Sequence, residues 1–194
     1  MLGKHNVTTE TPKNVLLGAG TYHKGLHWDS SSKKWAFEST IGATNGGGKI
    51  AINGELLDLE LDGALVSFKG QTVKVGGEAT MEVNMAELTV DNLKMAGRLT
   101  EGDSDADGYT MLIDKPNIEE GDYLENFGFV GKTANGAKDI IVIFENGLCT
   151  SALELEPKNK EQAVLKATIK AYAEIDGNLD TLPVKIYYPG TATV

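Results

Sequence analysis

The stretch GEATMEVNMAEL, residues 77–88, alternates apolar and polar side chains with a period of two. This alternation predicts a β-strand with one face in the protein core and the other face in water. The stretch AVLKATIKAYAEI, residues 163–175, repeats the pattern. Both are long, because an ordinary strand has about five or six residues. The polar positions of the two strands are expected to face water: Thr80, Glu82, Asn84, Lys166, Thr168, Lys170 and Tyr172.

Strand patterns also dominate the rest of the chain. Eight further strands are predicted, at residues 14–17, 49–61, 64–69, 72–76, 123–130, 139–144, 148–155 and 184–188. The pairs Asp62-Gly63, Asn135-Gly136 and Asn146-Gly147 predict hairpin turns, since glycine tolerates the positive φ that such turns require. The three apolar runs between residues 123 and 155 are therefore predicted as a meander. Asn53-Gly54 shifts the apolar phase of its strand, as a bulge does.

One α-helix is predicted, at residues 89–99. Thr89 is its N-cap, and apolar side chains recur at helical spacing at Val90, Leu93 and Ala96. The polar stretches 18–47 and 100–122 are predicted as extended loops. Because so much irregular chain is unusual in a compact monomer, we expect contacts outside the monomer to order these stretches.

The length of 194 residues fits a single domain. We expect a core at residues 14–188, with an N-terminal arm at 1–13 and a C-terminal arm at 189–194. Cys149 is the one cysteine, so no disulfide framework exists, and its side chain is expected to be buried. No run of about eighteen apolar residues occurs, and we expect neither a signal peptide nor a membrane span.

The charge balance argues against a nucleic-acid-binding protein. The chain has 28 acidic and 18 basic residues, whereas recognition of duplex DNA normally begins with a basic patch. The excess is local, because residues 101–125 hold nine acids and one lysine, Lys115.

Part of that segment, DSDADGYTMLID at residues 103–114, has the spacing of a calcium-binding loop. The ligands would be four carboxylates and one backbone carbonyl: Asp103, Asp105, Asp107, Asp114 and Tyr109. Two departures weaken this interpretation, since the twelfth position is Asp rather than Glu, and Pro116 prevents a helix from following. A solvated acidic loop with an Asp-Gly turn is the favoured interpretation, and a calcium ion that stiffens the loop is the alternative.

We expect no enzymatic activity. No serine or cysteine lies in a nucleophile motif, and the three histidines all precede residue 28. Four carboxylates do crowd one predicted strand, at Glu55, Asp58, Glu60 and Asp62, and a hydrolase using them is a third hypothesis. Such groups are common on the wet face of a strand.

The order of four segments resembles the major tail tube proteins of long-tailed phages and prophages of Gram-positive bacteria. The segments are VLLGAGTYHKG (15–25), STIGATNGGGKI (39–50), LDGALVSFKG (61–70) and EATMEVNMAELTVDNLKMAGRL (78–99). The glycine-rich GATNGGG before a strand, the acidic hairpin LELDGALVSFKG and the strand-to-helix step EVNMAELTVDNLK carry the likeness, which covers about residues 14–188. The DSDADG loop is a departure from the family pattern.

The resemblance implies a mainly β fold: a two-sheet β-sandwich flanked by one short α-helix, with long loops and terminal arms. It also implies that six subunits close a ring, each giving four strands to a barrel around a channel, and that rings stack into a tube that delivers DNA to the host. Implied partners are further copies of the chain and the tape measure, tail terminator and distal tail proteins. DNA is transient cargo, and the location is the virion tail, assembled in the host cytoplasm. No cofactor is required.

In such a tube the wet strand faces become candidates for the channel wall, and stretch 18–47 and the arms become inter-subunit contacts that fold on assembly. The acidic segment would lie on the outer wall or at a ring seam. A wall that releases DNA should not be basic. Lys166 and Lys170 add positive charge, which any of Glu55, Asp58, Glu60 or Glu174 would offset if it shares that surface. The alternative function is a calcium-dependent β-sandwich binding or adhesion module.

Overall fold

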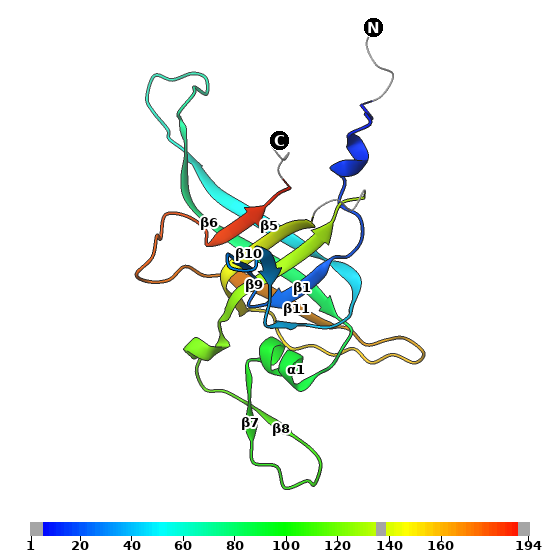
Figure 1. Ribbon diagram of the computed structural model, residues 1–194. Helices are drawn as coiled ribbons and strands as arrows, with labels where there is room; N and C mark the ends of the chain where they lie inside the picture. The colour runs from blue at the N-terminus through cyan, green and yellow to red at the C-terminus, as the bar shows by residue number, and fades with distance from the viewer. Residues whose placement is uncertain (1–5, 135–138, 190–194) are drawn as a thin grey trace.

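The computed structural model describes residues 6–134 and 139–189, in which β-strands predominate, every strand pairing is antiparallel and one α-helix is present (Figure 1). The strands are β1 (Thr21–Lys24), β2 (His27–Asp29), β3 (Lys34–Ala36), β4 (Ser39–Thr40), β5 (Thr44–Asp58), β6 (Thr72–Met85), β7 (Leu99–Gly102), β8 (Met111–Asp114), β9 (Leu124–Lys132), β10 (Asp139–Cys149), β11 (Leu165–Ala171) and β12 (Val184–Tyr187). The α-helix is α1 (Val90–Gly97), and two short 3-10 helices are η1 (Thr11–Lys13) and η2 (Glu120–Asp122).

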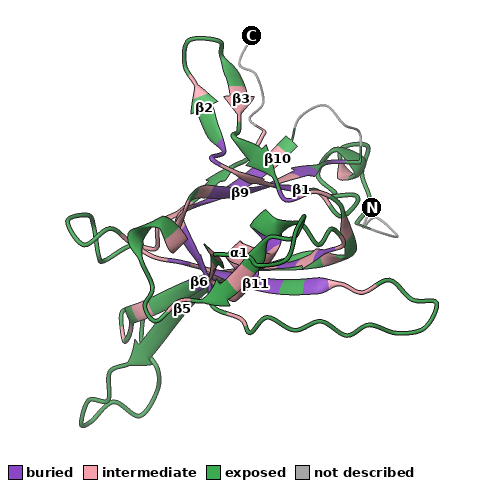
Figure 2. Cartoon of the chain, turned by 90° about the horizontal axis from the view of Figure 1, so that it is seen from below, coloured by how far each residue is buried: buried purple, intermediate pink, exposed green. Residues whose placement is uncertain are grey.

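Eight of the strands form one sheet that folds into the two layers of a sandwich. The strand order is β4-β1-β9-β10-β11-β6-β5, and β12 also pairs with β10. β10 belongs to both layers, because its first half pairs with β12 while Gly147–Cys149 pair with β11. Seen from below, β1 and β9 lie across the core from β6 and β11 (Figure 2). The predicted β-sandwich with one short α-helix is confirmed, and its two layers are continuous through β10.

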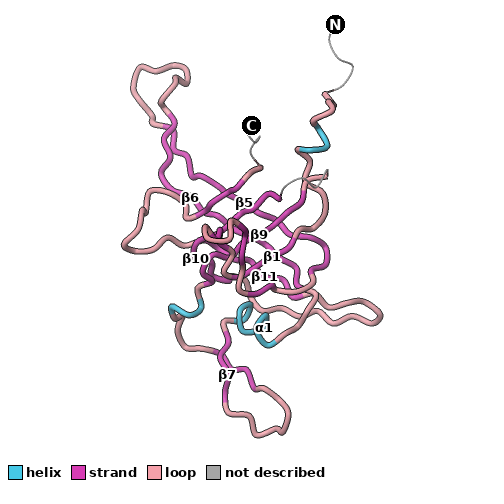
Figure 3. The backbone as a smooth tube through the Cα atoms, in the orientation of Figure 1, coloured by secondary structure: helices cyan, strands magenta, loops and turns pink. Residues whose placement is uncertain are grey.

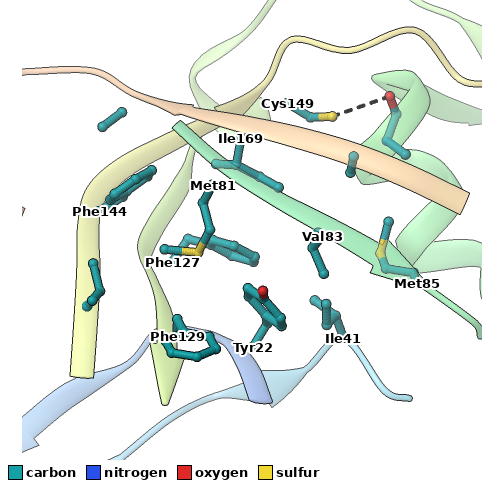
Figure 4. Packing of buried hydrophobic residues seen from close by; sticks show 14 of the residues in the cluster. Tyr22, Ile41, Met81, Val83, Met85, Phe127, Phe129, Phe144, Cys149 and Ile169 are labelled. Carbon is teal, nitrogen blue, oxygen red and sulfur yellow. Dashed lines mark hydrogen bonds between the residues drawn. The ribbon is translucent and has the colours of Figure 1, made fainter. Parts of the chain in front are cut away.

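The core lies between the layers and is filled from both of them. Strands β6 and β11 contribute Ala79, Met81, Val83, Met85, Leu165, Ala167, Ile169 and Ala171, all buried. The opposite layer contributes Tyr22, Phe127, Phe129, Val142 and Phe144 (Figure 4). Cys149 is buried as expected, and its Sγ lies 3.6 Å from the carbonyl oxygen of Ala96. The alternation at 77–88 and 163–175 therefore predicted the two strands and their buried faces correctly.

The helix begins at its predicted N-cap and ends at Gly97, two residues before its predicted end. The Oγ1 of Thr89 accepts a hydrogen bond from the backbone N–H of Asn92 at 3.2 Å, which satisfies one of the free donors of the first turn. Arg98 closes the helix in the left-handed conformation with φ of 52°. Its guanidinium donates to the carbonyl oxygens of Cys149 (2.8 Å) and Ser151 (3.2 Å), so the helix end is tied to the end of β10.

The turn predicted at Asn146-Gly147 is wrong, because β10 continues through it to Cys149. A Cβ on Gly147 would lie 2.6 Å from the side chain of Ile169, so glycine allows a close approach here rather than a turn. The predicted three-strand meander is therefore the β9–β10 hairpin, and the strand predicted at 148–155 ends at Cys149. Asn135 and Gly136 lie outside the described residues.

The turn at Asp62-Gly63 is confirmed by the positive φ of Gly63, 88°, but its hairpin is wider than predicted. β5 pairs with β6 only as far as Asp58 and Thr72, and residues 64–69 form no strand. The pairing also shifts register between Glu55 and Leu56, next to the predicted bulge at Asn53-Gly54.

The prediction that 18–47 and 100–122 are extended loops is wrong. The first stretch contains β1 to β4, and the second contains β8, most of β7 and η2. Tyr22, Leu26 and Ile41 are all buried, so the first stretch is part of the folded monomer. Strands of two to four residues are too short to display a clear period in the sequence.

The segment between η1 and β1 meets the residue that follows β12. Residues 14–17 form no strand; Leu16 makes an isolated bridge with Thr133. The hydroxyl of Tyr188 donates to Oδ1 of Asn14 at 2.8 Å, which joins the segment after η1 to the residue after β12. Residues 1–5 and 190–194 of the predicted arms lie outside the described residues. Within 6–134 and 139–189, no helix has both the length and the apolar character needed to cross a membrane.

Candidate functional site

Six of the seven predicted polar residues lie together on the outer face of the β5–β6–β11 layer. The register pairs Asn84 with Lys166, Glu82 with Thr168 and Thr80 with Lys170. The residues between them on both strands are buried, so alternation points these six side chains away from the core. We call this surface, with its continuation on β5, the polar face.

Tyr172 lies apart from this ladder, just beyond the end of β11. Its ring packs edge-on against Tyr123, with ring centres 5.7 Å apart and an interplanar angle of 84°. Both tyrosines line a cleft of about 420 Å³ together with Ile118, Glu174 and Ile175. Its backbone N–H still donates to the carbonyl oxygen of Asn146 in β10 at 2.8 Å, so the ring contact with Tyr123 is what sets it apart from the other six.

β5 extends the polar face on the far side of β6. Its register places Lys49 opposite Glu82 and Ala51 opposite Thr80. The ammonium of Lys49 lies 3.2 Å from a carboxylate oxygen of Glu82, and the Nδ2 of Asn84 donates to the carbonyl oxygen of Gly47 at 3.1 Å. On the other side, Lys170 lies 3.2 Å from Glu78. Acids therefore line the central strand β6, and lysines lie on the strands that flank it.

The acids that could offset Lys166 and Lys170 do not all lie on the polar face. Glu55 is on the polar face, opposite Gly76 at one end of it. Glu174 accepts a hydrogen bond from Nδ2 of Asn146 at 2.7 Å, and Asp58 accepts one from Thr72. Three exposed carboxylates lie at the end of β5 and in the segment that follows it: Asp58, Glu60 and Asp62.

Sequence reasoning missed Glu78 and Lys49, the two residues that complete the ion pairs. Glu78 could have been found, because it continues the alternation of Thr80, Glu82 and Asn84 by one step. Lys49 begins the predicted strand 49–61, but its partner could not have been found, since its pairing with Glu82 depends on the register between β5 and β6.

The five residues of the predicted calcium loop are distributed along the β7–β8 hairpin. Asp103, Asp105, Asp107 and Tyr109 lie in its turn, where Gly108 has φ of 79°. Asp114 lies at the opposite end of the hairpin, paired with Leu99. Asp114, the twelfth position of the loop, therefore lies away from Asp103, Asp105 and Asp107. In the described part of the chain no group of three or more histidine, cysteine, aspartate or glutamate side chains could hold a metal ion.

The β5–β6 hairpin projects from the body (Figures 1 and 3), and many of its large apolar side chains are exposed. The exposed large apolar residues of the segment 56–75 are Leu56, Leu57, Leu59, Leu61, Leu65, Val66, Phe68 and Val75. We call this segment the apolar hairpin. β5 is also the last strand of its sheet, so its outer edge has no strand partner within residues 6–134 and 139–189.

Neither a scan against protein-family models nor a search of curated proteins found a match for this chain.

Proposed function

We propose that this protein is the structural subunit of a phage tail tube, and that copies of it assemble into stacked hexameric rings around a DNA channel. One observation carries the proposal: the apolar hairpin continues directly from a long strand whose outer edge is unpaired. The resemblance of the sequence to tail tube proteins supplies the identity of the assembly.

The apolar hairpin supports self-association. Leu65 is 97% exposed and Val66 is 79% exposed, and contiguous apolar surface of this kind marks an interaction site in soluble proteins. The free edge of β5 offers backbone donors and acceptors to another strand, and closing a sheet into a barrel satisfies them. A second copy of the chain supplies both kinds of surface.

The polar face supports the role of channel wall. A strand between a water-filled channel and a protein core has one polar and one apolar face, as β6 and β11 have. Four strands neighbour one another in this layer, namely β5, β6, β11 and the end of β10, which is the number each subunit would give to the barrel. The proposed partners are other copies and the tape measure, terminator and distal tail proteins, with DNA as transient cargo.

Electron microscopy of concentrated purified protein tests the proposal. We expect rings with six-fold symmetry or tubes built from them. A chain that stays monomeric at all concentrations, by light scattering as well as by microscopy, would contradict it.

The second candidate is the calcium-dependent binding module. The pairing of Asp114 with Leu99 does not favour it. Asp114 is the twelfth position of the loop, which would hold the ion with two oxygens, and it lies away from the turn. Titration calorimetry with calcium separates the two functions, since the module requires stoichiometric binding and the tube does not.

A further inference from the structure

The cleft that Tyr123 and Tyr172 line is a second candidate binding site, beyond the end of the polar face. Its volume of about 420 Å³ is within the range of clefts that bind small molecules. It lies between residues 118–125, which include η2 and the start of β9, and residues 172–175, which follow β11. Apart from Asn146 and Ala173, the side chains around it are aromatic, large and apolar, or acidic.

The charge of this cleft is negative. Four glutamates line it, and no lysine, arginine or histidine of residues 6–134 and 139–189 does: Glu119, Glu120, Glu125 and Glu174. Lys115 lies 3.3 Å from Glu119. Lys24 lines an adjoining cleft with Glu120 and Glu125, but the carboxylate that acts on its ammonium is Asp91. Because walls of one sign concentrate the electric field, the cleft attracts a cation.

The two tyrosine rings give the cleft a feature that acids alone do not. They pack edge-on, with ring centres 5.7 Å apart and an interplanar angle of 84°, so they form an aromatic corner. The face of an aromatic ring attracts an ammonium or guanidinium group, and cages of aromatic rings recognise substituted ammonium ions. The corner therefore points to an organic cation independently of the glutamates.

The rim of the cleft is apolar. Ile118 is 56% exposed and Ile175 is 86% exposed, and each comes from a different one of the two segments. An alkyl chain that covers them removes apolar surface from water. A hydrated Mg²⁺ ion gains nothing from them, since it keeps its waters and prefers oxygen ligands. The cleft therefore favours a cation whose charges are joined by methylene groups.

The cleft also continues into a second one, of about 370 Å³. Glu125, Asn146, Ala173 and Glu174 line both. The second cleft adds Glu145, whose carboxylate is paired with Lys185. Glu125 and Glu174 thus lie where the two clefts join, so a ligand with more than one ammonium meets more than one carboxylate.

We propose that this cleft binds an organic cation with two or more ammonium groups on an alkyl chain. The tyrosine rings and the carboxylates of Glu120, Glu125 and Glu174 hold the ammonium groups, and the two isoleucines cover the methylene groups. A free polyamine and the lysine side chains of a polypeptide share this chemistry. The site is formed by one chain and does not depend on assembly into a tube.

Titration calorimetry of the full chain with spermidine tests the site. We expect one spermidine per chain. Tyr172→Leu should weaken binding about threefold or more, because it removes an aromatic ring and keeps an apolar side chain. Glu125→Gln/Glu174→Gln should weaken binding about threefold to tenfold, because two charged contacts are lost. Circular dichroism checks that each variant is folded.

The acidic β7–β8 turn offers matched controls. Asp103→Asn/Asp105→Asn removes two exposed acids, and Tyr109→Leu replaces a tyrosine that is 77% exposed. Both variants should bind spermidine like the wild type. Magnesium chloride should displace spermidine no better than sodium chloride of the same ionic strength, since Mg²⁺ has no methylene groups to cover the rim.

The proposal is overturned if the cleft variants bind spermidine as tightly as the controls, because the net charge of −10 would then explain the affinity. A blocked dilysine peptide separates the two sources of the ligand. Tighter binding of the peptide assigns the cleft to a polypeptide side chain, and tighter binding of spermidine assigns it to a free polyamine. If the wild type binds neither, the proposal is wrong. A failure to form tubes would contradict the tail tube assignment alone.

Discussion

The Nδ2 amide of Asn92 donates a hydrogen bond to the carbonyl oxygen of Ile41 across 2.9 Å. Both residues are buried, and the same amide also donates to the carbonyl oxygen of Glu87 at 2.9 Å. One side chain of α1 therefore holds the segment between β4 and β5 against the exit of β6. This contact connects the first fifty residues of the chain to the end of β6.

Replacing Asn92 with alanine should destabilise the protein by about 1–3 kcal/mol, because the buried carbonyl of Ile41 and the part-buried carbonyl of Glu87 lose their donor. Urea unfolding followed by circular dichroism measures the change. Asn117→Ala, in an exposed loop, is the control and should stay within about 0.5 kcal/mol of the wild type. Equal losses in the two variants would show that the contact with Ile41 does not stabilise the fold.

The N-cap of α1 can be tested in the same way. Thr89→Ala should lower the free energy of unfolding by about 1 kcal/mol, since the backbone N–H of Asn92 loses its acceptor. Thr89→Ser keeps a hydroxyl and should retain most of the stability. The cap has no role if serine and alanine behave alike.

Core packing gives a larger effect. Met81 is 0% exposed, between the two layers, and Met81→Ala should cost about 2–5 kcal/mol through lost burial and the cavity left behind. Leu65→Ala, in the apolar hairpin, should change the stability of the monomer by less than about 0.5 kcal/mol. Chemical denaturation of both variants measures the contrast, and a comparable loss at Leu65 would mean that the hairpin is packed rather than exposed.

Acid should weaken the anchoring of η2. The pKa of the Asp122 carboxyl lies below its usual value. Burial is the largest single influence and raises this pKa, but hydrogen bonds from the backbone N–H of Glu119 and from the Lys115 ammonium together lower it by more. The ionised carboxylate therefore stabilises the fold above the unfolded pKa of about 3.9, and this contribution is lost as the pH falls through the folded pKa.

Asp122→Asn should consequently be less stable than the wild type at pH 7, and the difference should shrink as the pH falls below about 4. Thermal unfolding measured across this range gives both quantities. Asp105→Asn, in the exposed β7–β8 turn, is the control and should be as stable as the wild type at pH 7. A constant difference between Asp122→Asn and the wild type would exclude the ionised carboxylate as the cause.

Assembly should depend on the apolar hairpin. Leu65→Asp/Val66→Asp places two charges on its most exposed apolar positions and should prevent ring and tube formation while leaving the circular dichroism spectrum unchanged. The control is Ile175→Asp/Leu179→Asp, which changes two exposed apolar residues of a different loop. Light scattering and microscopy compare the two double variants. Tube formation by the hairpin variant would show that the hairpin is not part of the interface.

The sequence predicted the elements that are long or chemically distinct. Alternation over 77–88 and 163–175 identified β6 and β11 with their buried faces, and a capping threonine with spaced apolar residues identified α1. It failed for β1 to β4, which are too short for a period to be recognised, and at Gly147, where glycine serves close packing against Ile169. Local chemistry could not distinguish that glycine from one in a turn.

The sequence alone therefore predicts that this is a mainly β protein and that β6 and β11 each have one wet face, and it predicts seven polar side chains there, of which six lie on those faces in the structure. It does so because side-chain direction alternates along a strand whatever its neighbours are. Tertiary structure alone decided that Lys49 meets Glu82 and Lys170 meets Glu78, and that Asp114 pairs with Leu99 away from the acidic turn. Those contacts depend on the register between strands, which hydrogen bonding and packing across the whole sheet select.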